Sequence, residues 1–148
     1  MALIEYKKAR LKYSFLETFQ AGIELFGAEV KSLRGKQGKL DGARVVVRGG
    51  EAFLVGMHIP PYQPANTPAG YDPDRTRKLL LTKREIGEIA TAEEHKGLTV
   101  VPIEVYNTNR LIKVRVAIVR GKRKADKRED LKLKDAKREM ERALKRRR

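Results

Sequence analysis

The sequence contains no cysteine and no tryptophan, and its 148 residues include only two histidines, His58 and His95. Without cysteine there can be no disulfide framework, no thiolate metal site and no cysteine nucleophile. Two histidines far apart in the chain argue against a histidine-rich metal centre. We interpret His58 as a hydrogen-bonded structural residue and His95 as an exposed residue beside a helix end.

Long hydrophobic runs and catalytic motifs are also missing. The longest strictly apolar runs, such as residues 45–47, are far shorter than a membrane span, and residues 1–5 do not begin a secretory signal. No P-loop and no Gly-x-Ser-x-Gly motif occurs. We therefore expect a cytoplasmic protein that is not an enzyme, with no catalytic residues, no metal, no cofactor and no small-molecule substrate.

One group of carboxylates leaves an alternative open. Asp72, Asp74 and Glu85 could hold Mg²⁺, as a phosphodiesterase would require. Basic residues at positions 75, 77 and 78 lie between these carboxylates. A solvated cluster of ion pairs is therefore the favoured interpretation.

Positive charge is the property that the chain has in excess. There are 34 Lys and Arg residues against 19 Asp and Glu, which gives a net charge of +15 and a pI of 10.2. Such an excess on a small chain indicates a polyanionic partner, most often nucleic acid, with an anionic membrane surface as the competitor. The positive charge is equally compatible with a ribosomal or general RNA-binding protein and with a protein that binds one specific RNA.

The charge is concentrated at the C-terminal end. Residues 121–148 contain 14 basic and 6 acidic residues, and too few apolar ones to offset the entropy of ordering, so we expect this tail to be disordered when free. Leu133, Ala136, Met140 and Leu144 nevertheless fall on one stripe at helical spacing. A helix could form once a polyanion neutralises the repulsion. The sequence thus predicts a folded domain over residues 1–120 and a basic tail over 121–148.

The pattern of residues 1–120 predicts short strands with two inserted helices. Alternating or apolar runs predict strands over residues 11–19, 43–48, 51–59, 99–105 and 112–118, with turns at 49–50 and 106–110 and a bulge or bend at 21–22. One helix is expected over 28–34, ended by Gly35, and another from the capping box Thr82–Glu85 to Lys96. Five prolines mark residues 60–73 as a surface loop.

These elements favour a mainly β fold. The best fit is a small antiparallel barrel of the oligonucleotide-binding type, with two or three short helices and the basic C-terminal tail. A two-layer α+β sandwich is the alternative.

Three basic stretches contain or adjoin tyrosines. The stretches hold Lys7, Lys8, Arg10 and Lys12; Lys31, Arg34, Lys36 and Lys39; and Arg75, Arg77 and Lys78. The neighbouring tyrosines are Tyr6, Tyr13, Tyr62 and Tyr71. Exposed rings there could stack on unpaired bases, although burial of any one ring is at least as common.

Eight segments, in one order along the chain, resemble the SsrA-binding protein (SmpB) family. The most specific are residues 29–34 (EVKSLR) and, within the matching segment 72–81, residues 76–81 (TRKLLL). The resemblance also extends over residues 8–13, 17–23, 58–62, 83–86, 96–102 and 121–129. It implies a bacterial ribosome-rescue factor with an oligonucleotide-binding-like barrel and a C-terminal tail that is unstructured in solution.

The family resemblance also implies the partners and the mechanism. The barrel would bind the tRNA-like domain of transfer-messenger RNA and deliver it to the A site of a stalled ribosome, the first step of trans-translation. The tail would lie in the empty mRNA channel beyond the decoding centre of the small subunit and fold there as a helix. No membrane is implied.

Residue by residue, the resemblance implies two sets of contacts. RNA binding is implied for Lys7, Lys8, Arg10, Tyr13, Gln20, Glu29, Lys31, Arg34, Arg75, Arg77 and Lys78. Contacts with the ribosome and the mRNA channel are implied for Gly121, Lys122, Arg123, Lys124, Asp126, Lys127, Arg128, Lys134, Arg138 and Lys145. The sequence departs from the family at Tyr6, usually Asn, at Gln20, usually Glu, and at Ala125, usually Tyr or His. Loss of a stacking ring at position 125 would remove about 1–3 kcal/mol.

Overall fold

A computed structural model of the chain describes residues 2–122, Arg138 and Arg142. Seven of the tail residues named above lie outside these described residues: Arg123, Lys124, Asp126, Lys127, Arg128, Lys134 and Lys145. The tail position Ala125 lies outside them too, whereas Arg138 is described and exposed.

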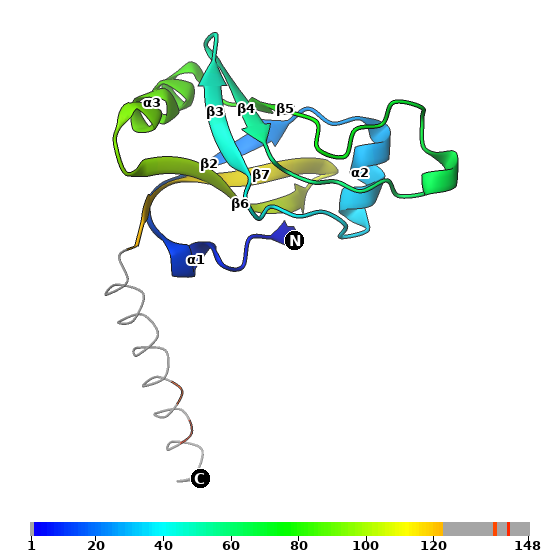
Figure 1. Cartoon of the computed structure of the whole chain (residues 1–148), viewed down its shortest axis with the longest axis horizontal. Helices are drawn as coiled ribbons and strands as arrows, with labels where there is room; N and C mark the ends of the chain where they lie inside the picture. Colours follow the sequence, from blue (N-terminus) through cyan, green and yellow to red (C-terminus); the bar gives the residue numbers. More distant parts are fainter. Residues whose placement is uncertain (1, 123–137, 139–141, 143–148) are drawn as a thin grey trace.

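Seven strands form one antiparallel sheet in the order β1-β6-β7-β2-β5-β4-β3 (Figure 1). They are β1 (Ala2–Glu5), β2 (Tyr13–Ile23), β3 (Arg44–Arg48), β4 (Glu51–Val55), β5 (Arg77–Leu80), β6 (Leu98–Thr108) and β7 (Leu111–Gly121). The sheet curls so that β3, at one edge, packs against β6 near the other edge. This curled sheet confirms the mainly β, oligonucleotide-binding-like fold that the sequence predicts.

Within residues 2–122, three short α-helices and one 3₁₀ turn accompany the sheet. They are α1 (Ala9–Lys12), α2 (Gly27–Arg34), α3 (Lys83–Glu94) and η1 (Pro64–Asn66). The predicted capping box begins α3, because the Thr82 hydroxyl accepts from the Glu85 amide at 3.2 Å and the Glu85 carboxylate accepts from the Thr82 amide at 3.0 Å. None of the described helices has the length and apolar character needed to span a bilayer.

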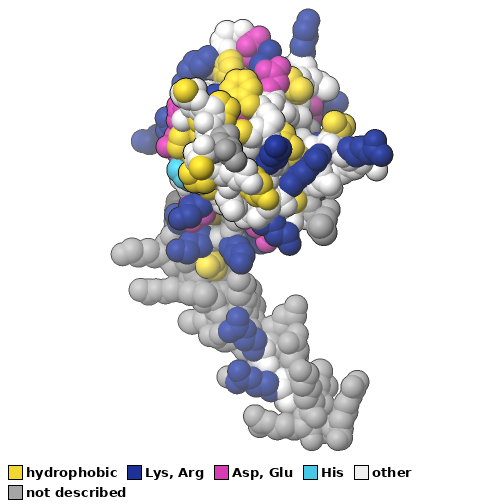
Figure 2. Space-filling view, turned by 90° about the vertical axis from the view of Figure 1, so that its right-hand side faces the viewer, with side chains coloured by type: hydrophobic (Ala, Val, Ile, Leu, Met, Phe, Trp, Pro, Cys, Tyr) yellow, Lys and Arg dark blue, Asp and Glu magenta, His cyan; other side chains and the backbone are white. Residues whose placement is uncertain are grey.

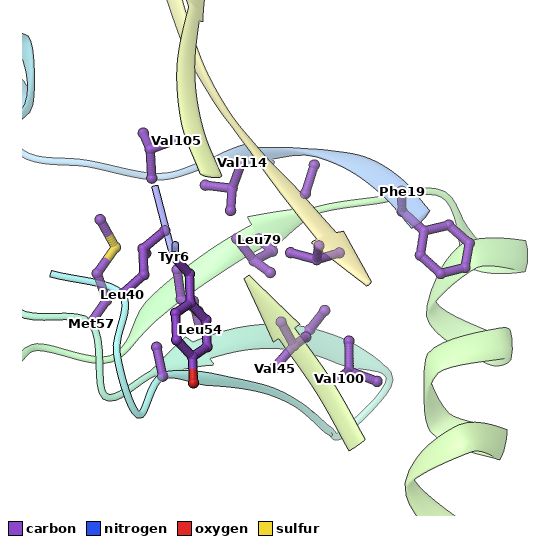
Figure 3. Packing of buried hydrophobic residues seen from close by; sticks show 14 of the residues in the cluster. Tyr6, Phe19, Leu40, Val45, Leu54, Met57, Leu79, Val100, Val105 and Val114 are labelled. Carbon is purple, nitrogen blue, oxygen red and sulfur yellow. The ribbon is translucent and has the colours of Figure 1, made fainter. Parts of the chain in front are cut away.

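The main core lies inside the curled sheet. Figure 3 shows Val45, Leu54, Leu79, Val100 and Val114 converging there from five different strands. Burial of each such side chain contributes about 1.5–3 kcal/mol, so this core is the main source of stability. A smaller cluster, Val101, Ala117 and Val119, is buried on the other face of β6 and β7.

The beginning of the chain differs from the strand expected over residues 11–19. Residues 9–12 form the single turn α1, in which the Leu11 and Lys12 amides both donate to the Lys8 carbonyl. The reason is topological, since β1 pairs with β6 while β2 pairs with β7, so the chain must cross this strand pair between them. β2 then continues unbroken to Ile23, and its irregularity lies between Phe15 and Glu17 rather than at residues 21–22.

Three further segments differ in detail from what the sequence patterns predict. Strand β4 ends at Val55, not at residue 59, because Gly56 has φ +82°. The positive φ shifts the alternation of inward and outward side chains by one residue, so that Leu54 and then Met57 face the core. Helix α2 ends at Gly35 as predicted, but Gly35 has φ −81° and it is Lys36 that takes the left-handed conformation. The sequence patterns predict no strand over residues 77–80, but these residues form β5 between β2 and β4.

Candidate nucleic-acid interface

A groove of about 810 Å³ lies where α1 and the segment before it meet β2, β6 and β7. We call it the N-terminal groove; its charged and polar lining is Glu5, Lys7, Arg10, Thr18, Gln20, Glu104 and Arg115. The Arg10 guanidinium lies 4.8 Å from the centre of the Phe15 ring. The structure therefore brings together the predicted residues Lys7, Arg10 and Gln20.

A second groove, of about 590 Å³, follows the junction of β2 with β5. We call it the β2–β5 groove; its lining includes Gln20, Gly22, Glu51, Lys78, Leu80 and Lys113. Leu80 is 50% exposed and lies over Gly22, where an added Cβ would come within 3.1 Å of the Leu80 Cβ. The close approach of these two strands therefore explains why residue 22 is glycine.

Gln20 lines both grooves, so the two form one continuous surface. Two of its cations are paired, Arg115 with Glu104 and Lys78 with Glu51 at 3.2 Å. Among the described residues, no acidic side chain pairs with Lys7 or Lys113. The surface thus offers unpaired cations that can contact phosphates and an amide that can form hydrogen bonds with nucleotides, beside an exposed apolar side chain.

Leu80 and Lys113 are missed by the sequence prediction. The alternation of the strands gives a weak signal for each residue. Leu80 and Lys113 each follow or precede a buried residue of the same strand, so their side chains face outward. Only the register, in which Gly22 lies opposite both residues, shows that they share one groove.

A buried ion-pair cluster fixes the start of α2. Glu29 is 1% exposed and accepts from the Arg75 and Arg77 guanidinium groups, each at 2.6 Å. Burial raises the pKa of Glu29, but the hydrogen bonds from Arg75, from the Phe26 amide and from Arg77 outweigh it and hold the pKa below its usual value. One carboxylate thus faces two guanidinium groups, and the cluster has an excess positive charge.

Arg77 and Glu29, for which the family resemblance implies contacts with RNA, are both buried in this structure. Arg77 is fully buried and also donates to the carbonyls of Met57 at 2.8 Å and Pro73 at 3.0 Å. It therefore joins α2, β5 and the proline-rich loop. Arg75 is partly exposed, and its guanidinium lies 4.2 Å from the centre of the Phe26 ring. Phe26 is 62% exposed and is another residue that the sequence prediction misses.

The remaining predicted residues lie at separate places on the surface. Lys8 is exposed just before α1, and Lys31 is exposed on α2. The Arg34 guanidinium donates to the Arg110 carbonyl at 3.1 Å, which links α2 to the β6–β7 turn. Gly121 pairs with the half-buried Tyr13, and the Lys122 amide donates to the Lys12 carbonyl at 2.9 Å, so the tail begins beside α1.

The tyrosines considered for stacking have different environments. Tyr6 is buried at 5% exposure, and Tyr13 packs partly into the core. The Tyr71 hydroxyl donates to the Ile59 carbonyl at 2.8 Å, and burial and the neighbouring Glu29 raise the pKa of this hydroxyl. Tyr62 is 47% exposed and is the one ring of the four that stays open to solvent.

The ion pairs differ from those expected: among the described residues, Arg75 and Arg77 pair with Glu29 and Lys78 pairs with Glu51, and none of them pairs with the carboxylates at positions 72, 74 and 85. The His58 ring lies 2.8 Å from an Asp74 carboxylate oxygen, and its backbone bridges to Lys39, which confirms a structural role. His95 caps the C-terminal end of α3, as predicted. Within the part of the chain that the structure describes, no three His, Asp or Glu side chains gather in a way that could hold a metal ion.

Comparison with known proteins shows the family to which the chain belongs. The SmpB protein family model matches residues 3–146. An SsrA-binding protein of Oleidesulfovibrio alaskensis is 49% identical over 145 residues, covering 96% of this chain and 91% of the relative. One of Thermosynechococcus vestitus is 46% identical over 145 residues, covering 98% and 95%.

A solved structure is also similar to this chain in fold and sequence. It is described as "tmRNA-SmpB: a journey to the center of the bacterial ribosome". It is similar with a TM-score of 0.70 at 39% identity, over 88% of this chain and 95% of the other. By family model, relatives and fold, the chain belongs to the SmpB protein family.

Proposed function

We propose that this chain is an RNA-binding adaptor that binds the tRNA-like domain of transfer-messenger RNA and delivers it to the A site of stalled ribosomes. Its relatives are SsrA-binding proteins, and the similar solved structure concerns tmRNA, SmpB and the bacterial ribosome. The observation that carries the proposal is the continuous surface made by the two grooves that meet at Gln20. The chain acts by binding, without catalysis, in the cytoplasm where ribosomes work.

The basic tail supplies the second half of the proposal. Residues 121–148 carry a net charge of +8 and an apolar stripe at helical spacing. The tail leaves the folded domain beside α1, at the end of β7. We infer that it is disordered in the free protein and forms a helix in the vacant mRNA channel, where rRNA phosphates neutralise its charge.

A competition titration tests the RNA-binding half. Labelled tRNA-like domain is bound to the full chain at about 150–200 mM salt, where screening weakens nonspecific phosphate contacts. Unlabelled tRNA-like domain, ordinary tRNA and single-stranded RNA then compete for the protein. Strong preference for the tRNA-like domain is expected. Equal competition by all three RNAs would instead identify a general RNA-binding protein.

A further inference from the structure

A small cleft lies between α2 and the proline-rich loop. Its volume is about 300 Å³. It is lined by three residues of α2 and four of the proline-rich loop: Gly27, Ala28, Lys31, Tyr62, Gln63, Thr67 and Pro68. It shares no lining residue with the N-terminal groove or the β2–β5 groove. We call it the α2–loop cleft.

The walls of the α2–loop cleft are held in place. The buried Ser32 hydroxyl donates to the Pro60 carbonyl at 2.6 Å, which ties the loop to α2. Inside the loop, the Thr67 hydroxyl donates to the Gln63 carbonyl at 2.7 Å. These contacts order the segment on both sides of Tyr62, so the cleft is formed before any ligand arrives.

The chemistry of the α2–loop cleft suits one planar, anionic group. Tyr62 contributes an exposed ring to the cleft. The α2 wall contains the small residues Gly27 and Ala28, which leave room for a ligand. An added Cβ at Gly27 would meet nothing within 4 Å, which shows that this wall is open. The volume is at the lower end of the range for ligand sites, enough for one base but not for a peptide helix.

The charge around the α2–loop cleft favours an anion. Lys31 is the one charged residue in its described lining, and no acidic side chain is among them. Just before Gly27, the exposed Phe26 ring lies against the Arg75 guanidinium. Arg75 belongs to the buried ion-pair cluster, which has an excess positive charge. Figure 2, which faces the side where α2 and the loop lie in Figure 1, shows hydrophobic side chains beside Lys and Arg side chains.

We propose that the α2–loop cleft binds one unpaired nucleotide of an RNA, with its base stacked on Tyr62 and its phosphate at Lys31. Aromatic rings and neighbouring cations are the features by which proteins hold unpaired bases. The proposal rests on the RNA-binding function proposed above and adds a contact outside the surface that contains Gln20. The nucleotide can belong to transfer-messenger RNA or to ribosomal RNA, and the experiment separates these two sources.

The test compares four variants of the full chain with the wild type in two binding assays. Tyr62→Ala removes the ring, Tyr62→Phe keeps it, and Gly27→Leu adds a large side chain to the α2 wall of the cleft. Leu16→Ala is the matched control, because Leu16 is an exposed apolar residue on β2 outside the cleft. The assays measure affinity for the isolated tRNA-like domain and for ribosomes stalled on a truncated message.

Tyr62→Ala and Gly27→Leu should each weaken one of the two affinities about tenfold, the loss that corresponds to one stacked base. Tyr62→Phe and Leu16→Ala should bind like the wild type. A loss confined to the tRNA-like domain assigns the nucleotide to transfer-messenger RNA, and a loss confined to ribosomes assigns it to ribosomal RNA. Melting temperatures of all variants confirm that they fold.

Two results would overturn the inference: unchanged affinities for Tyr62→Ala and Gly27→Leu in both assays, or a Tyr62→Phe variant as weak as Tyr62→Ala. Failure of the proposed function looks different. In that case the wild type itself shows no preference for the tRNA-like domain over ordinary tRNA.

Discussion

Glu29 shows how one residue can hold several segments together. Its carboxylate binds the guanidinium groups of Arg75 and Arg77 and also accepts from the Phe26 amide at 2.8 Å. These contacts join the start of α2 to the segment that leads into β5. Removing the carboxylate would leave two guanidinium groups close together, one of them fully buried, with no compensating charge.

Glu29→Gln should therefore lower the free energy of unfolding by about 3 kcal/mol. Urea denaturation at pH 7 measures the change. Glu24→Gln is the control, because Glu24 is exposed and its replacement should change stability by less than about 0.5 kcal/mol. Equal effects of the two variants would show that the charge of Glu29 in the buried ion-pair cluster adds no stability.

The same carboxylate predicts a dependence on pH. Because the folded pKa of Glu29 lies below its usual value of 4.5, the ionised form stabilises the fold at higher pH. This stability is lost as the pH falls through the lowered folded pKa. The difference between wild type and Glu29→Gln should thus be largest near neutral pH and shrink below about pH 4.5. Urea denaturation from pH 7 to pH 3 measures it, and a constant difference would contradict the assignment.

Individual functional residues are only partly predictable from the sequence. Lys7 and Arg10 are charged residues in a basic stretch, so surface exposure follows from their chemistry. Arg77 has the same chemistry but is buried, because Glu29, 48 positions away, supplies its partner. Leu80 shows the opposite case, an apolar residue exposed by its position over Gly22. Both outcomes depend on tertiary pairing, which a local pattern does not contain.

At the scale of elements, α3 contains a residue that costs helix stability. Gly87 lies inside this helix, is exposed, and has room for a Cβ with no atom within 4 Å. Gly87→Ala should raise the free energy of unfolding by about 0.5–1 kcal/mol, because alanine loses less backbone entropy in a helix. Thermal denaturation measures the shift in Tm.

Gly56→Ala is the contrasting variant. Gly56 has φ +82°, and an added Cβ would lie 3.1 Å from the Gly42 carbonyl oxygen, so this change should destabilise the protein. If Gly87→Ala also lowered the Tm, intrinsic helix propensity would not be the factor that limits α3.

Elements with strong local signals are predicted well, and those created by topology are not. The Thr82 capping box and the Gly49-Gly50 turn depend on neighbouring residues alone, and both are found as expected. In contrast, α1 exists because the chain crosses from β1 to β2, and β5 exists because residues 77–80 fill the place between β2 and β4. The reversal at Gly56 likewise follows from a positive φ that alternation alone does not reveal.

At the scale of the whole molecule, binding should depend on salt through specific cations. A lysine that contacts a phosphate contributes about 0.7–0.9 to the slope of log affinity against log salt. Lys113→Ala, in the β2–β5 groove, should reduce the slope for the tRNA-like domain by about this amount. Lys96→Ala is the matched control, because Lys96 is exposed and lines neither groove. Identical slopes for both variants would place the RNA elsewhere.

The division of labour between the folded domain and the tail leads to the last prediction. A chain ending at Lys122 keeps both grooves and the backbone contact of Lys122 with Lys12, but its net charge falls from +15 to +8. Its affinity for the tRNA-like domain at about 150–200 mM salt should stay within about threefold, since screening at this salt suppresses the long-range attraction of the tail. Tagging on stalled ribosomes should be lost, because this step needs the segment that enters the mRNA channel.

A chain with a shuffled tail of the same composition separates charge from helix formation. Shuffling keeps every charge but destroys the stripe of Leu133, Ala136, Met140 and Leu144. If the tail works as an amphipathic helix, the shuffled chain should bind the tRNA-like domain normally and still fail to tag. Normal tagging by this variant would mean that positive charge alone suffices in the channel. Loss of RNA binding by the chain ending at Lys122 would mean that the tail belongs to the RNA-binding surface and that the two steps are not separate.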